Sequence, residues 1–227
     1  MCLFMDRINT VDNLRGIAFI FMMIHHVFYF YDVSNNYQTS LSKNILVDTS
    51  GHISRNLFIF LAGYSLYLAF KKNKKTFKKN RFKNSLKILL HAAFISTITF
   101  VYFPDMFIRF GVLHFIGVST LLASLSIDND IGLILIALSL FFVPSINPYI
   151  DNMIGTKVSY LQMDYFALNK WFILLVAGIF FSKYDSINSI FNLENPTFLS
   201  NIGKNCLNLY TLHITIFILI AHIKKIT

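Results

Sequence analysis

The chain has 227 residues, of which 55% are hydrophobic and 14% are charged, with a mean hydropathy of +0.57. A soluble domain carries about a quarter charged residues, so an ordinary soluble globule is not expected, and 25 Phe and 11 Tyr exclude disorder. The net charge of +9 suggests nucleic-acid binding, but nine of the 20 Lys and Arg lie in Lys71–Lys87, between two apolar stretches. This is the charge placement of a membrane protein, so we expect a lipid bilayer and no nucleic acid as partner.

Apolar runs recur along the whole chain, each near the length that crosses ~30 Å of hydrocarbon. Backbone groups in lipid must be satisfied internally, which predicts helices. The runs are Leu14–Tyr31, Ile53–Phe70, Leu86–Phe103, Phe107–Leu125, Ile131–Ile146, Tyr165–Ser182 and Cys206–Ile223. The prediction is an all-α, polytopic integral membrane helix bundle with about seven transmembrane helices, forming a single domain over residues 1–227.

The basic segments predict the orientation of the chain in the membrane. When Lys71–Lys87 is placed in the cytoplasm, Lys183 and Lys204 fall on the same side. Lys224 and Lys225 count against this arrangement. The balance of Lys and Arg predicts a cytoplasmic N-terminus, and the sequence leaves open whether the chain forms a homo-oligomer.

Histidines are the main ionisable residues inside the apolar runs, and polar groups at that depth usually face the bundle interior. Arg15 and His26 are eleven residues apart, which returns to within about 20° of the same helix face, about 16 Å along the axis. Asp12 precedes Arg15 by three residues and can pair with it. His25 lies about 100° off this face and is not expected to share the same site. A membrane anchor for Arg15 and a hydrogen-bonded interior role for His26 remain open alternatives.

Further polar residues recur near the ends of other runs. His52 and Arg55 are three residues apart at the start of the second run, and Arg109 and His114 belong to the fourth. Tyr210 and His213 share one face of the last run, where a structural hydrogen bond is as plausible as a role in a site. Arg55, Arg109, His114, Tyr210 and His213 are candidate substrate-binding residues. We find no metal-binding motif and no nucleotide-binding glycine motif.

The segment from Val11 to Ala18, followed by His26, resembles the first helix of the transmembrane acyltransferase superfamily, in which an arginine, ten residues and a histidine are a hallmark. Within it, the chain is similar to the small bacterial and archaeal proteins related to the heparan-α-glucosaminide N-acetyltransferase catalytic domain. Supporting segments are Phe58–Ser65, Arg109–Ser119, Asp164–Phe166 and Ile202–His213.

The resemblance implies transfer of an acyl group, usually acetyl from acetyl-CoA, to a hydroxyl or amine, commonly of a sugar or glycoconjugate. It implies that His26 is the catalytic residue, as a general base or as a nucleophile that carries the acyl group. Arg15 would bind the CoA donor, and Arg55, His114 and His213 would position the acceptor or stabilise the oxyanion. No metal is implied.

Departures from the family pattern occur at Asn169-Lys170 and Ile214-Thr215, where prolines are frequent in the family. A membrane transporter or permease, whose path the histidines would line, is one alternative function. A non-catalytic membrane protein on the same scaffold is the other.

Overall fold

The computed structural model describes residues 9–156, 161–184, 195 and 197–226. Arg7, Lys157 and Cys2 lie outside the described residues. The described part of the chain is helical and contains no strand, as the sequence predicts.

Among the described residues, four helices are long and apolar enough to cross a membrane. They are α1 (Asn9–Ser34), α2 (Ile45–Lys72), α3 (Phe77–Tyr102) and α10 (Cys206–Ile226). Shorter helices are α4 (Val112–Leu125), α5 (Asp130–Ser139), α6 (Pro148–Ile154), α7 (Leu168–Tyr184) and α9 (Phe198–Lys204), with 3-10 turns at Leu41–Lys43 and Pro104–Met106.

The predicted count of about seven spans is not confirmed, although a helix occupies part of each of the seven runs. In the fourth run, residues 107–111 are not helical and α4 has 14 residues. The fifth run is shorter than predicted, because α5 ends at Ser139 after 10 residues and not at Ile146. Pro144 contributes to this early end, since proline restricts the residue before it and lacks an N–H.

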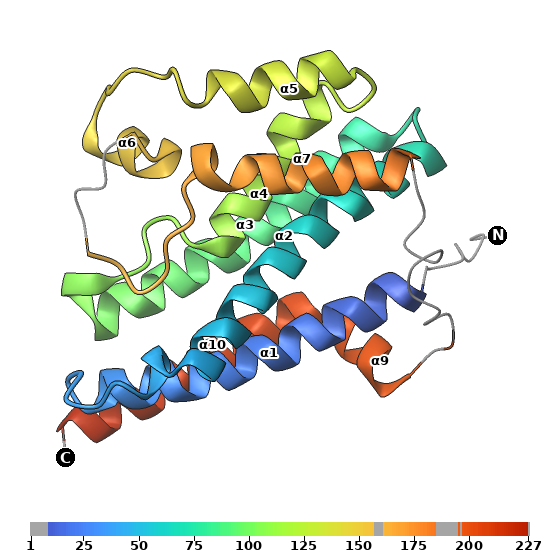
Figure 1. Ribbon diagram of the computed structural model, residues 1–227. Helices are drawn as coiled ribbons and strands as arrows, with labels where there is room; N and C mark the ends of the chain where they lie inside the picture. Colours follow the sequence, from blue (N-terminus) through green and yellow to red (C-terminus); the bar gives the residue numbers. More distant parts are fainter. Residues whose placement is uncertain (1–8, 157–160, 185–194, 196, 227) are drawn as a thin grey trace.

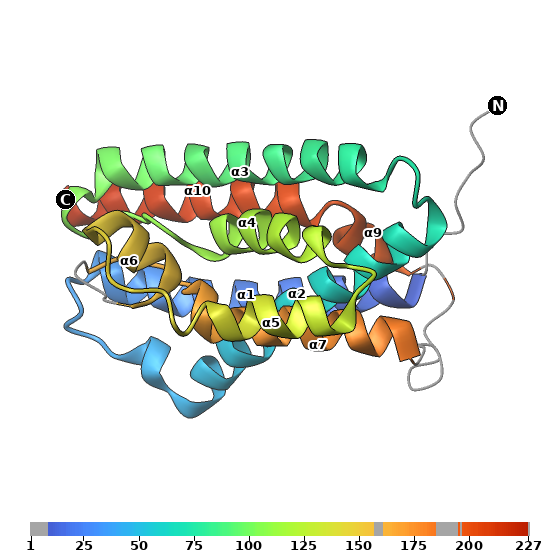
Figure 2. The ribbon, with the colours of Figure 1, turned by 90° about the horizontal axis from the view of Figure 1, so that it is seen from above.

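The helices form one bundle in which chain direction alternates (Figures 1 and 2). The start of α1, the α2–α3 connection, the end of α7 and α9 lie at one end, which we call the basic end because it carries Lys71–Lys83. The start of α2, the helix α6 and the end of α10 lie towards the opposite end (Figures 1 and 2). α1 packs against α2, α9 and α10, while α2 packs against α7 and α3 against α4.

Two glycines allow α2 and α7 to approach at backbone distance. A Cβ atom at Gly63 would fall on the carbonyl oxygen of Leu175, and one at Gly178 would fall on the carbonyl oxygen of Phe60. Small residues at such crossings let helix backbones pack closely in membranes. This contact closes one side of the bundle, and a cavity lies on the other side, between α1, α2, α3, α4 and α10.

Substitution of Gly63 by alanine is expected to destabilise the fold by about 1–3 kcal/mol, the usual cost of overpacking, because the added methyl group meets backbone that cannot rotate away. The thermal unfolding midpoint of the purified protein in detergent measures this. Gly117→Ala is the matched control, since its Cβ would meet the flexible end of the Leu89 side chain. Equal midpoints for the two variants would contradict the prediction.

Candidate active site

A cavity of about 400 Å³ lies among the long helices, a volume typical of small-molecule sites. Its wall contains residues of α1, α2, α3, α4 and α10, together with residues 163–166 before α7. On α1 it extends from Arg15 to Phe30, about 22 Å at 1.5 Å per residue. The cavity therefore follows most of the ~30 Å that separates the two faces of a bilayer.

His26 lines the cavity between its two ends. Its Nδ1 atom is 2.9 Å from Nε2 of His213, and the two rings are stacked with centroids 5.2 Å apart. Nδ1 of His213 is 2.9 Å from the carbonyl oxygen of Leu209. Tyr210 is buried, lines the cavity and meets His26 edge-on, with centroids 6.4 Å apart. α1 and α10 thus bring together three residues that are distant in sequence.

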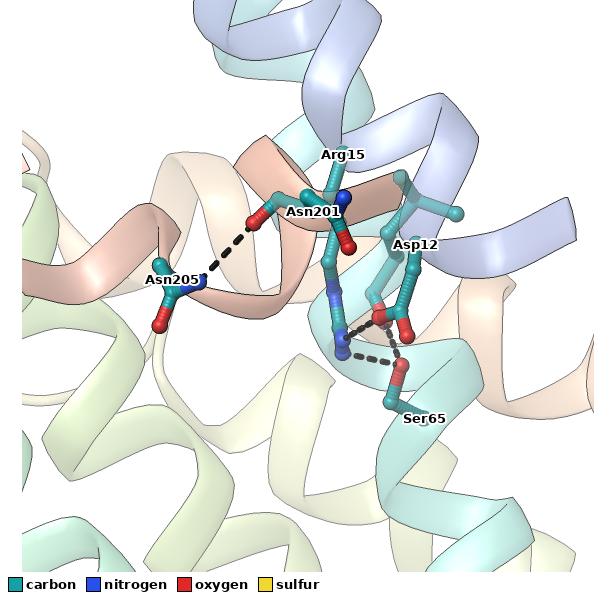
Figure 3. A network of polar contacts seen from close by, with 6 residues as sticks. Asp12, Arg15, Ser65, Asn201 and Asn205 are labelled. Atoms are coloured by element: carbon teal, nitrogen blue, oxygen red, sulfur yellow. Dashed lines mark hydrogen bonds and ion pairs between the residues drawn. The ribbon is translucent and has the colours of Figure 1, made fainter. Parts of the chain in front are cut away.

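Arg15 lines the cavity near the basic end, where its guanidinium lies between Asp12 and Ser65 (Figure 3). It donates to Oδ1 of Asp12 at 3.0 Å and to Oγ of Ser65 at 2.6 Å. Figure 3 also shows Asn205 donating to the carbonyl of Asn201, at 3.0 Å, where α9 ends. The predicted pairing of Asp12 with Arg15 is confirmed, and Ser65 adds a fixed acceptor from α2.

Arg81 is a second arginine in the cavity wall, and sequence reasoning missed it. It lies in the first turns of α3, where its Nε donates to Oγ of Ser85 at 3.1 Å. Ser85 is hydrogen-bonded in turn to Thr120 of α4. The sequence offers no reason to choose Arg81 among the nine basic residues of this segment. Which of these side chains faces the cavity depends on how the helices pack, and not on local spacing.

Arg55 and Asp164 also line the cavity wall. Arg55 lies 2.7 Å from Nδ1 of His52, and its guanidinium is 5.6 Å from the centre of the Trp171 ring. Asp164 accepts a hydrogen bond from the Val112 amide at 2.9 Å, at the start of α4. Burial raises the pKa of the Asp164 carboxyl to about 6, although this hydrogen bond and the charge of Arg55 act to lower it. Asp164 was noted only as part of a motif and was not among the predicted site residues.

Three predicted site residues, Arg109, His114 and His213, are not among the residues that line this cavity. His114 borders a neighbouring space of about 10 Å³, no larger than a water molecule needs. Its Nδ1 accepts from the Gly111 amide at 3.3 Å, which caps the start of α4. The Arg109 guanidinium lies 4.2 Å from the centre of the Phe107 ring and 3.4 Å from the Leu161 carbonyl.

The expectation that His25 cannot share the site with His26 was wrong in one respect, because His25 lines the same cavity. Its Nδ1 is 3.3 Å from the carbonyl oxygen of Val47, which turns the ring towards α2. Since α2 forms part of the wall, two faces of α1 reach the cavity, and the 100° between the residues does not separate them.

The chain matches one protein-family model over most of its length. The family described as heparan-alpha-glucosaminide N-acetyltransferase, catalytic, matches residues 7–215. The chain belongs to this family. It is therefore an integral membrane protein of an acyltransferase family, which confirms the resemblance read from the sequence. No curated protein and no solved structure matches the chain. The described residues contain no group of three His, Cys, Asp or Glu side chains placed to hold a metal ion.

Asp164 makes the stability of this acyltransferase-family protein depend on pH. Its folded-state pKa of about 6 lies above the ordinary value of 3.8, so the folded protein holds the proton more tightly. The resulting stabilisation is full below about pH 4 and is lost as the pH rises through about 6. Asp164→Asn keeps an oxygen for the Val112 amide but does not titrate, so its unfolding midpoint is expected to fall less over this range.

Thermal unfolding in detergent at a series of pH values measures this difference. Asp105→Asn, which replaces an exposed carboxylate in the turn after α3, leaves Asp164 intact and is the matched control. A wild-type midpoint whose change with pH equals that of Asp164→Asn would contradict the assignment.

Proposed function

We propose that the chain is a membrane-embedded acyltransferase that moves an acetyl group from acetyl-CoA to a hydroxyl or amine of a carbohydrate acceptor. The observation that carries the proposal is one cavity whose wall contains His26 together with Arg15 and Arg81 near the basic end, and with Arg55 and Asp164. Donor and acceptor would enter from opposite ends and meet at His26. In this arrangement the N-terminus and the basic end face the cytoplasm.

The donor end offers cations next to apolar walls, which fits the chemistry of acyl-CoA. Asp12 neutralises much of the Arg15 charge, whereas Arg81 is bonded to a neutral hydroxyl. Guanidinium groups bind phosphate well because they present several N–H donors in a plane. We assign the CoA phosphates to Arg81 together with Arg15, and the acyl-bearing arm to the apolar cavity beyond them.

The acceptor end offers polar groups suited to a polyhydroxy ligand. Nε of Arg55 is buried and has no hydrogen-bond partner among the described residues, so it is available to an acceptor oxygen. Asp164 offers a carboxylate oxygen to an acceptor O–H or N–H group. Such groups fix the orientation of a ligand in a largely apolar site.

His26 would act at the thioester by one of two routes. As a general base, it takes the acceptor's proton while the acceptor oxygen or nitrogen bonds to the thioester carbonyl carbon. The C–S bond then breaks, and the proton passes from His26 to the CoA sulfur. As a nucleophile, His26 carries the acyl group before the acceptor takes it. Tyr210 and Arg55 would stabilise negative charge on the carbonyl oxygen, where the dry site strengthens the interaction.

Release of CoA from radiolabelled acetyl-CoA by the purified protein in detergent tests the proposal. Wild-type protein is expected to bind acetyl-CoA and release CoA, His26→Ala to bind without turnover, and Arg15→Ala to bind more weakly. His222→Ala, on α10 beside Tyr102 and outside the cavity wall, is the control expected to turn over normally. Radiolabel that stays covalently attached to the wild-type protein after denaturation, but not to denatured His26→Ala, would identify the nucleophile route.

Failure of the folded wild-type protein to bind any acyl-CoA would contradict the proposal. Flux of a solute through reconstituted vesicles without acyl-CoA would then favour a transporter. Absence of both binding and flux would favour a non-catalytic membrane protein.

Arg81→Ala is expected to raise KM for acetyl-CoA on the order of tenfold with kcat nearly unchanged. A hydrogen bond to a charged group contributes about 1.5–3 kcal/mol, and this one would be lost equally from the ground state and the transition state. Lys79→Ala, on the same helix and exposed, is the matched control. A wild-type KM in Arg81→Ala, or a KM raised equally in both variants, would remove Arg81 from the donor site.

A further inference from the structure

We propose that His213 is a positioning residue that decides which ring nitrogen of His26 carries the proton, leaving Nε2 of His26 as the reactive atom. The inference rests on the proposed function for its catalytic consequence. It replaces the role that the family resemblance implied for His213, which was to position the acceptor or to stabilise the oxyanion. The arrangement that carries it is a hydrogen-bonded series from the Leu209 carbonyl through His213 to His26.

The series starts at the Leu209 carbonyl oxygen, which can act only as a hydrogen-bond acceptor. A backbone carbonyl oxygen only accepts hydrogen bonds. Because Nδ1 of His213 lies 2.9 Å from the Leu209 carbonyl oxygen, Nδ1 must carry the hydrogen. A neutral imidazole carries one N–H, so Nε2 of His213 is an acceptor. Leu209 lies four residues before His213 on α10, so one turn of the helix fixes the ring.

The protonation of His213 in turn determines which nitrogen of His26 carries the hydrogen. Nε2 of His213 lies 2.9 Å from Nδ1 of His26. As Nε2 of His213 accepts, Nδ1 of His26 must donate, and the remaining nitrogen of His26 then has a free lone pair. Nε2 of His26 has no hydrogen-bond partner in the described part of the chain, and the residue lines the cavity. An unprotonated nitrogen thus remains available to a substrate in the cavity.

Both chemical routes require this tautomer. As a base, Nε2 of His26 receives the acceptor proton, which leaves when the C–S bond breaks and the CoA sulfur takes it. As a nucleophile, Nε2 bonds to the carbonyl carbon while the C–S bond breaks and CoA leaves as the thiolate. The acceptor then bonds to that carbon, the bond from the carbon to Nε2 breaks, and the acceptor's proton passes to the thiolate. In each case Nδ1–H continues to donate to His213, which favours the positively charged ring that forms on His26. His213 itself exchanges no proton.

The environment of His213 supports a positioning role. The His213 ring is buried, and Phe19, Tyr210 and Phe217 contact it edge-on. Partners that orient a metal-bound histidine through its second nitrogen change metal affinity or activity about 10–100-fold when replaced, and we expect an effect of the same size for a histidine that reacts directly. Leucine at position 213 would remove the acceptor. Glutamine would keep an amide oxygen that can accept from Nδ1 of His26.

The first test is nitrogen NMR of histidine-labelled protein in detergent micelles, with the His26 signals assigned by their loss in His26→Ala. The expected result is His26 protonated at Nδ1 in the wild-type and His213→Gln proteins, and at Nε2 or in exchange in His213→Leu. Protonation of wild-type His26 at Nε2 would overturn the inference. This measurement needs no substrate, so it separates a failure of the inference from a failure of the proposed function.

The second test is steady-state release of CoA from acetyl-CoA by the purified protein. His213→Leu is expected to lower kcat about 10–100-fold while KM for acetyl-CoA changes little, and His213→Gln should recover much of the loss. His222→Gln makes the same substitution on the same helix outside the cavity wall and should behave as wild type. A kcat for His213→Leu equal to that of wild type would overturn the inference. If His213→Leu does not fold, the tautomer in wild type and the activity of His213→Gln still decide it.

Discussion

The absence of water in the hydrocarbon core governs this structure, because every polar group there needs a partner inside the protein. Arg15 illustrates the solution, with Asp12 and Ser65 satisfying its guanidinium from two helices. His213 uses the carbonyl one turn earlier on its own helix. Nε of Arg55 and Nε2 of His26 differ, since both side chains line the cavity and neither atom has a partner within the described chain. In the proposed function, these two atoms are the ones that would bind a ligand in the cavity.

Close helix contacts on one side of the bundle leave room for the cavity on the other. Gly63 and Gly178 bring the backbones of α2 and α7 together, and Gly16 does the same for α1 against Leu199 of α9. These contacts anchor α1 at the basic end and α2 along its length. α1 and α2 then present Arg15, His26 and Arg55 to a common space. Helix packing, more than any local motif, thus sets the separation of the two arginines from the histidine.

The spacing of residues in the sequence correctly predicted which side chains share one face of a single helix. It did not predict which side chains of different elements come together. The eleven-residue interval placed Arg15 and His26 on one face of α1, and both line the cavity. Asp164 and Arg81 escaped prediction because their positions depend on the segment before α7 and on the α3–α4 contact. His114 was predicted as a site residue, but its ring caps α4. Hydropathy located the helices yet not their ends, since Pro144 and residues 107–111 shorten two of them.

The hydrogen-bonded series also constrains where a proton can travel in the proposed reaction. Nδ1 of His26 is held by His213, whose own Nδ1 is held by a carbonyl that cannot take a proton. A proton gained at Nε2 of His26 therefore returns through the cavity, and the CoA sulfur is the base that becomes available there when the C–S bond breaks. Nε2 of His26 thus takes the proton from the acceptor and gives the same proton to the departing CoA. Under this coupling His26 returns to its starting tautomer after each transfer without exchange with water.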